Sequence, residues 1–393
     1  MSNRIAAEQF LDLSRGKWML CRFPDLTFRH TVAARWFRVP RIGNARTFLV
    51  AVFLVFAVVG ASSAGPYEDA VAAYERADYP TAARLWRPLA ERGDPTAQLM
   101  LGSMLHDGQG VPQDFAEALH WFRRAADQGN ARAQSRVGRM YQSGTGVAQD
   151  YAWALYWYRK AAEQGEVTAQ GGLGAMYSSG QGVARDDTEA VRWFREAAEQ
   201  GDESAQLSLG VKHQQGLGVA KDYTESARWF RKAAEQGNAI GQRSLGRAYE
   251  VGEGVPRDRA QAVRWYRKAA DQGDASAQGD LGKAYATGEG AARDQGQAAR
   301  WFRKAADQGG ATAQGRLGVM YLAGVGVPQD YVQAYIWLNL SAARGIKRAA
   351  EERDKLAQSM TPAQIAQAKK LARECKPTAG RRCDLRYYFP VVQ

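Results

Sequence analysis

The apolar residues of this chain recur at helical spacing, in stripes separated by polar residues and glycines. In one segment Ala118, Trp121, Phe122 and Ala125 lie at positions i, i+3, i+4 and i+7, which is one face of an α-helix. Residues 133–141 repeat the pattern with apolar residues at four-residue steps. The pattern predicts pairs of short amphipathic helices, and the repeated segments contain no strand signal.

The predicted helix pair recurs every 36 residues, without insertion or deletion, across residues 94–345. The most regular positions are the tryptophans Trp121, Trp157, Trp193, Trp229, Trp265, Trp301 and Trp337. A fixed period of this size is typical of solenoids, in which each unit buries its apolar face against its neighbours. The sequence therefore predicts an all-α fold, an α/α superhelical solenoid of seven tandem helix-turn-helix repeats, with the tryptophans as structural residues.

The ends of both helices in a unit carry recognisable signals. The first helix follows an Asp or Asn such as Asp94 or Asn130, whose side chain can accept the free N–H groups of a first turn. It ends near a glycine such as Gly108, suited to the left-handed closing conformation. The second helix opens with a residue such as Asp114, and Glu117 three residues later predicts a capping box.

The motifs L-G-x-x-Y in the first helix and W-[FY]-x-K-A-A in the second resemble those of Sel-one-like (SLR) repeats. The G-x-G-V loop, seen at residues 144–147, is similar to the loop that separates these repeats from tetratricopeptide repeats. The resemblance implies a scaffold or adaptor that binds a protein or peptide in the groove of a superhelix and catalyses nothing. Residues 65–93 resemble a degenerate leading repeat with Leu85 in place of Trp, and residues 346–374 resemble the closing helices of bacterial members.

The N-terminal region has the pattern of an export signal. Residues 48–60 are an uninterrupted apolar run, residues 1–47 before it are basic, and small residues end the 48–64 segment at a suitable cleavage site. Two interpretations stay open: a cleaved signal peptide, or a retained short anchor in the inner membrane. Both predict that the repeats are exported to the periplasm or held there at the membrane surface.

The net charge of +12 lies at the two ends of the chain. Residues 1–47 and 345–393 carry +6 each, and residues 65–344 are neutral. A nucleic-acid binder would carry its basic excess on the folded repeats, so this class is not favoured. The basic C-terminal segment with Tyr387, Tyr388 and Phe389 leaves attachment to anionic lipid as a further hypothesis. Within the repeats, Arg159 and Lys160 precede Glu163 at a spacing that predicts weak ion pairs.

Two cysteines, Cys375 and Cys383, lie in the tail of residues 375–393. In an oxidising compartment they could close a small disulfide loop. Two free thiols in the tail are the alternative.

No motif in the repeats predicts catalysis, a cofactor or a metal site. The G-x-G pairs lack the strand and the Lys-Ser/Thr of a phosphate loop, so they are interpreted as turns. His106 and His120 bring no further ligands at metal spacing, and His213 stands in a tyrosine position as a packing variant. The rival hypothesis, an envelope enzyme or a β-lactam or peptidoglycan binder, finds its S-x-x-K motif only at residues 14–17, before the apolar run.

Binding specificity is expected where the first helix varies between units. The variable positions include a set of cations that could form a track in the groove and meet an acidic partner: Arg136, Arg139, Arg243, Arg247, Lys283 and Arg316. An ordinary solvated face is the alternative. The invariant glutamines Gln98, Gln134, Gln170, Gln206, Gln242, Gln278 and Gln314 allow two interpretations, either buried amides that bond backbone groups or a row that faces a bound peptide.

Overall fold

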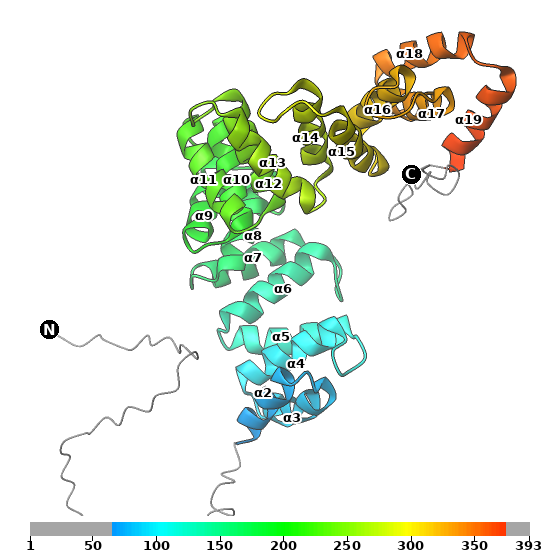
Figure 1. The fold of residues 1–393 in the computed structure, drawn as a ribbon. Coiled ribbons are helices and arrows are strands. Elements are labelled where there is room, and N and C mark those ends of the chain that lie inside the picture. The colour runs from blue at the N-terminus through cyan, green and yellow to red at the C-terminus, as the bar shows by residue number, and fades with distance from the viewer. Residues whose placement is uncertain (1–64, 375–393) are drawn as a thin grey trace, which may run out of the picture. The chain divides into compact units, whose positions relative to one another are not determined.

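The computed structural model describes residues 65–374, and every element within this range is a helix (Figure 1). The leading pair is α2 (Pro66–Glu75) and α3 (Tyr79–Glu91). The seven units follow as α4 (Pro95–Asp107) and α5 (Phe115–Asp127), α6 (Ala131–Ser143) and α7 (Tyr151–Ala162), α8 (Val167–Ser179) and α9 (Asp187–Glu199), α10 (Glu203–Gln215) and α11 (Tyr223–Glu235), α12 (Ala239–Val251) and α13 (Arg259–Asp271), α14 (Ala275–Thr287) and α15 (Gln295–Asp307), α16 (Ala311–Ala323) and α17 (Tyr331–Ala342). The last helices are α18 (Lys347–Gln358) and α19 (Pro362–Glu374).

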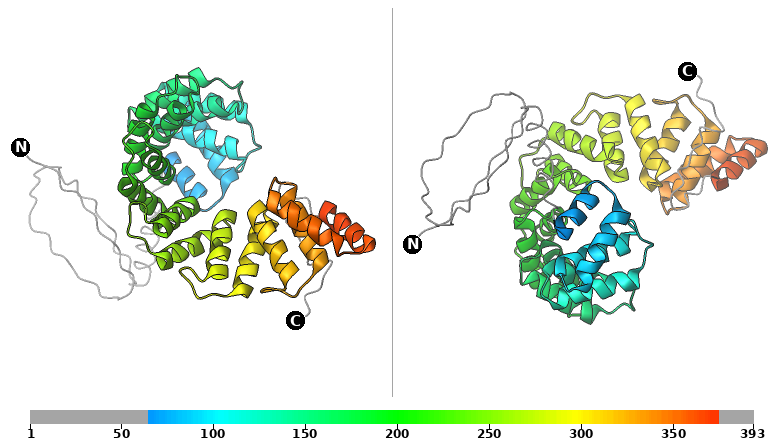
Figure 2. Two further views of the ribbon diagram at one scale, coloured as in Figure 1. Left: turned by 90° about the horizontal axis from the view of Figure 1, so that it is seen from above. Right: turned by 90° about the horizontal axis from the view of Figure 1, so that it is seen from below.

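From α2 to α18, each helix packs against the helix that follows or precedes it in the chain, and α19 packs against α17, so the described part is an α/α solenoid. Both further views show the same sequential order of hairpins, from the blue leading pair to the red last helix (Figure 2). The first helix of each unit is called helix A below, and the second helix B. The segments 1–47, 48–64 and 375–393, with Cys375 and Cys383, lie outside the described residues.

The predicted helix ends are confirmed. Asp94 Oδ1 accepts the N–H of Ala97 at 2.7 Å, and Gly108 closes α4 with φ of 69°. The second glycine of each G-x-G loop also has a packing role, because it lies directly on the start of the preceding helix B. A Cβ atom on Gly254 would stand 1.8 Å from the carbonyl oxygen of Tyr223. The loop glycines therefore have a structural role, which agrees with the interpretation of the G-x-G pairs as turns.

The predicted capping box forms only in part. Asp114 Oδ1 accepts the N–H of Glu117 at 2.9 Å, but the N–H of Asp114 donates to the carbonyl of Leu105 at the end of helix A. Glu117 Oε1 instead accepts from Trp121 Nε1 at 3.2 Å and from Arg87 Nη1 at 3.0 Å. The carbonyl of Leu105 thus takes the place of the Glu117 carboxylate as the partner of the Asp114 N–H. The Glu117 carboxylate is then free to accept from Arg87 of the preceding unit.

In the core of each of the first six units, an aromatic ring of helix B packs on a glycine of helix A. A Cβ atom on Gly102 would lie 2.8 Å from the ring of Phe122, so the L-G pair of helix A leaves space for the aromatic residue of helix B. The repeated tryptophans are buried, at 8% exposure or less, except that Trp265 is half-buried. In the leading pair Leu85 is half-buried and Trp86, one residue later, is 1% exposed. Burial of each indole contributes on the order of 2–3 kcal/mol.

The glutamine row bonds the backbone, which decides between the two interpretations. Each side chain is buried, and its Nε2 donates at 3.0–3.4 Å to a carbonyl at the end of the preceding helix B. In six units its Oε1 accepts from the glutamine of the Gln-Gly pair of its own unit, at 2.7–2.9 Å. These paired amides satisfy buried polar groups between consecutive hairpins.

The basic pair near the end of helix B has a different role from the predicted one. Arg159 Nη2 donates to the hydroxyl of Tyr177 in the next unit at 2.8 Å, and Lys160 Nζ lies 5.6 Å from the ring centre of Trp157. The corresponding lysines of three other units lie 3.9–4.2 Å from the ring centre of their tryptophan. The expected pairing with Glu163 is therefore wrong, because aromatic neighbours hold both cations.

Candidate functional site

The variable face of helix A forms a groove near the N-terminal end of the solenoid. Its lining residues come from α2, α4, α6 and the start of α8, and they enclose a cavity of about 440 Å³. We call this the N-terminal groove, and it is lined by Tyr74, Leu99, Met100, Ser103, Asp107, Arg132, Ser135, Arg136, Arg139, Glu166 and Thr168. Of the six predicted cations, the structure brings Arg136 and Arg139 together here and adds Arg132, which the sequence analysis did not include.

The three arginines of the N-terminal groove are exposed, and none has an ion pair or side-chain hydrogen bond among the described residues. Burial of the guanidinium in the groove lowers the pKa of Arg136, and the neighbouring charge of Arg139 lowers it further. An arginine stays protonated even so, which leaves an uncompensated and partly desolvated positive charge.

The two acidic residues of the groove are already engaged. Asp107 Oδ1 lies 2.7 Å from Nδ1 of His106. Glu166 Oε2 accepts the N–H of Ala169 at 2.6 Å and caps α8. Their charges oppose part of the lowering of the Arg136 pKa, but neither carboxylate has an ion pair or side-chain hydrogen bond with an arginine of the groove. The groove therefore has unused donors for an anionic group.

The cations predicted further along the chain are separated from this groove, and two of them are neutralised. Arg243 Nε lies 3.5 Å from Asp274 Oδ1, and Lys283 Nζ lies 2.8 Å from Glu250 Oε1. Arg247 is exposed and has no ion pair among the described residues. A continuous cationic track is therefore interrupted between the two ends of the solenoid.

The same middle region carries a pair of acidic groups. Glu250 Oε2 accepts the hydroxyl of Tyr266 at 2.7 Å. Burial raises the pKa of the neighbouring Asp280 to about 6, and the charge of Glu250 adds to the rise. Burial raises the pKa of Tyr266 as well. Lys283 neutralises Glu250, so this region does not add to a cationic surface.

The sixth cation, Arg316, lies on α16 and lines a separate cavity near the C-terminal end of the solenoid. Arg316 is exposed and has no ion pair among residues 65–374. The predicted track is therefore divided into the N-terminal groove, a middle region in which Arg243 and Lys283 are paired and Arg247 is not, and this C-terminal cavity.

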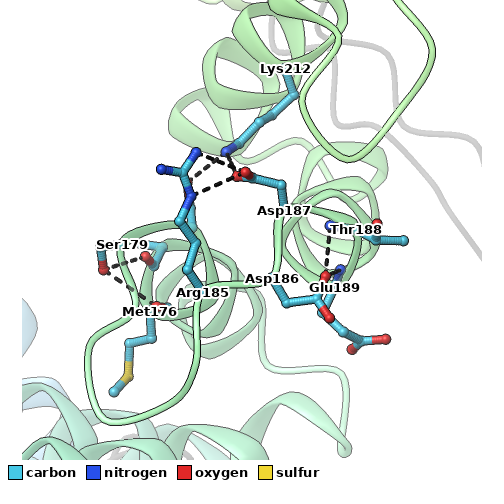
Figure 3. A network of polar contacts seen from close by, with 10 residues as sticks. Met176, Ser179, Arg185, Asp186, Asp187, Thr188, Glu189 and Lys212 are labelled. Carbon is cyan, nitrogen blue, oxygen red and sulfur yellow. Dashed lines mark hydrogen bonds and ion pairs between the residues drawn. The ribbon is translucent and has the colours of Figure 1, made fainter.

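One buried ion pair was not predicted from the sequence. Lys212 of α10 is 6% exposed and stands where other units carry Met104, Met140, Met176, Ala248, Ala284 and Met320. Its Nζ lies 2.5 Å from Asp187 Oδ1 and 2.7 Å from Ser178 Oγ, and Arg185 binds the other oxygen of Asp187 at 2.8 Å (Figure 3). A lysine in an otherwise apolar column was the available signal.

His213 takes the place expected of a packing residue. His213 is 6% exposed on α10, and burial lowers the pKa of its imidazole. His106 stacks edge-on against Phe115, with ring centres 5.2 Å apart. Within residues 65–374 no group of His, Cys, Asp and Glu side chains is arranged to hold a metal ion. In the same range, no helix has the length and apolar character needed to cross a bilayer.

These features define a helical repeat protein whose variable helix faces are open to a partner. A sequence profile of the Sel1 repeat matches seven consecutive segments, namely residues 95–130, 131–166, 167–202, 203–238, 239–274, 275–310 and 311–346. The chain belongs to the Sel1 repeat family. Proteins of this family are generally protein-interaction scaffolds.

Two solved structures of related proteins are similar to this chain. The chain is 39% identical to a Sel1 repeat protein from Oxalobacter formigenes over 70% of this chain and 80% of that one, with a TM-score of 0.58. It is 36% identical to c5321, a protective antigen of uropathogenic Escherichia coli with an SLR fold, over 75% of this chain and 79% of that one, with a TM-score of 0.40. No match was found among the curated proteins.

Proposed function

We propose that this protein is an exported scaffold that binds an acidic segment of a partner protein in the N-terminal groove. The observation that carries the proposal is the set of three arginines, Arg132, Arg136 and Arg139, that share one cavity and have no ion pair among the described residues. Guanidinium groups bind carboxylates through two parallel hydrogen bonds, which makes an acidic peptide the complementary ligand.

The rest of the groove supports a peptide as the ligand. Leu99 and Met100 of α4 provide half-buried apolar surface beside the arginines, and Ser135 and Thr168 add hydroxyl groups. A cavity of about 440 Å³ falls within the usual range for ligand sites. The expected ligand therefore combines carboxylates with an apolar side chain, within a few residues of chain.

The binding proposal is tested with the full chain and short fluorescent peptides that contain Asp or Glu beside one Leu, measured by anisotropy. Each arginine–carboxylate contact in such a groove is worth about 1.5 kcal/mol, so Arg136→Gln with Arg139→Gln should weaken binding by roughly 100-fold. Arg264→Gln with Arg300→Gln is the matched control, because both residues are exposed and lie on helix B, outside the groove. Equal affinity of the two double variants would refute the site.

Export is supported by the sequence of the N-terminal region, in which an apolar run follows basic residues and precedes small ones. A fusion of alkaline phosphatase after residue 393 tests it, because that enzyme is active only where its disulfides form. We expect activity from the full chain and none after deletion of residues 48–60. Activity that survives the deletion, or its absence from the full-chain fusion, would contradict export.

A further inference from the structure

The last two units and α18 enclose a second cavity, which differs in chemistry from the N-terminal groove. It has a volume of about 380 Å³ and is lined by residues of α14, α15, α16, α17 and α18. Its apolar wall consists of Ala286, Phe302, Val319, Met320, Leu338, Ile346 and Ala349, and its polar lining consists of Gln295, Thr312, Arg316, Arg348 and Glu352. We call this the C-terminal cavity.

One residue of the last unit that differs from the repeat, Leu338, contributes to the C-terminal cavity. Helix B of the other six units carries a ring at one packing position, namely Phe122, Tyr158, Phe194, Phe230, Tyr266 and Phe302. The last unit carries Leu338 there, which packs on Gly318 as the rings pack on their glycines and also lines the cavity. Leucine fills less volume than a phenyl ring, so the substitution leaves room beside α16.

The apolar wall reaches the surface. Val319 of α16 is 43% exposed, although it lies beside the buried Met320. An exposed apolar side chain at the mouth of an apolar cavity favours an apolar group from outside.

Charge at the C-terminal cavity is positive and uncompensated. Arg316 and Arg348 are both exposed, and neither has an ion pair or a side-chain hydrogen bond among residues 65–374. Glu352, the acidic residue of the lining, has Lys355 Nζ 3.5 Å from its Oε1. The complement of this surface is an apolar group with a carboxylate close to it.

We propose that the C-terminal cavity is a second binding site, which takes a protein segment with one large apolar side chain flanked by Asp or Glu. The Thr312 hydroxyl can bond a peptide backbone, and so can Oε1 of Gln295, whose Nε2 already donates to the carbonyl of Ala286 at 2.9 Å; this favours a peptide over a fatty acid that has the same apolar and anionic parts. The site shares no residue with the N-terminal groove, so the inference holds or fails independently of the proposed function.

The test uses the full chain and a panel of fluorescent nine-residue peptides that carry Leu, Met or Phe between two Asp residues. Leu338→Phe restores the ring of the other units and should fill the cavity, so this variant should bind the peptides at least tenfold more weakly than the original protein does. Arg316→Gln with Arg348→Gln, at exposed positions, should weaken binding to a similar extent. Arg264→Gln with Arg300→Gln, at exposed positions on helix B that line neither cavity, serves as the matched control and should leave binding of these peptides unchanged.

Three further results distinguish the alternatives. A peptide in which Ser replaces the apolar residue should bind at least tenfold more weakly than its parent. Unchanged circular dichroism and melting temperature of Leu338→Phe would show that its loss of binding arises at the cavity. The proposal is overturned if no peptide of the panel binds saturably, if Leu338→Phe binds as the original protein does, or if laurate binds the cavity and the peptides do not.

Discussion

The buried pair of Lys212 and Asp187 offers a sharp test of how this solenoid tolerates charge between its units. Asp187→Ala removes the carboxylate at 2.5 Å from Lys212 Nζ and leaves a buried ammonium with Ser178 as its remaining partner. Breaking a buried ion pair from one side costs about 3–5 kcal/mol. Because the Asp187 side chain is 18% exposed, we expect the lower end, about 3 kcal/mol.

The opposite change should be harmless. Lys212→Met restores the residue of four other units and leaves Asp187 paired with Arg185. Replacement of a buried charge by an apolar side chain of similar volume is often neutral or stabilising, by about 1 kcal/mol or more. When Lys212→Met is already present, the further change Asp187→Ala should lower the free energy of unfolding by well under 1 kcal/mol. A double-mutant cycle of the two substitutions should therefore give a coupling energy of about 2–3 kcal/mol.

The assay is urea unfolding of the full chain followed by circular dichroism, with hydrogen exchange over α9 and α10 to locate the effect. The hydrogen bond from Lys212 lowers the pKa of Asp187 below its usual 3.8. Its contribution is therefore present above that value and is lost as the pH falls through the lower, folded-state pKa. The difference in free energy of unfolding between the original protein and Asp187→Ala should be constant from about pH 5 to 8 and should disappear in stronger acid. Additive single and double variants would refute this reasoning.

Two further predictions concern the stack and its middle region. Gln134→Ala removes the buried partner of the Ala126 carbonyl and of the Gln164 amide, so it should destabilise the protein by about 1–3 kcal/mol. Gln215→Ala, at an exposed position of α10, should cost well under 1 kcal/mol in the same urea titration. Asp280→Asn should stabilise the protein by on the order of 2 kcal/mol at pH 8 and not at all below about pH 4. The raised pKa of Asp280 favours folding only while the carboxyl group is protonated, and this contribution is lost as the pH rises through about 6. Equal stability of the original protein and Asp280→Asn at both pH values would contradict the assignment.

The repeat made the fold predictable in detail. A side chain kept in every unit at one register has the same neighbours each time, so the end-capping Asp94 and closing Gly108 could be inferred from their chemistry. The partner of Gln98 could not, because helical spacing gives no information on which carbonyl of the preceding helix lies opposite. The capping box failed for a similar reason, since the backbone N–H of Asp114 is taken by a helix outside the local sequence.

The candidate site was predictable only in part. Variation within helix A singled out Arg136 and Arg139, and the structure places both in the lining of one groove. It could not show that Lys283 is neutralised by Glu250 from another unit, because that pairing depends on distance across the stack. Leu338 was overlooked because a leucine in an apolar column conserves polarity while changing volume.

The central claim, that the helix A face of the N-terminal groove holds an acidic protein segment, is tested most directly by crosslinking in the cell. A photoreactive phenylalanine at Ser103, which lines the groove, and one at the exposed Arg264 of α13 are compared in otherwise identical full chains. We predict a discrete adduct from Ser103 only, with the crosslinked peptide rich in Asp or Glu. No adduct from Ser103, the same adduct from Arg264, or a crosslinked peptide without acidic residues would contradict the account.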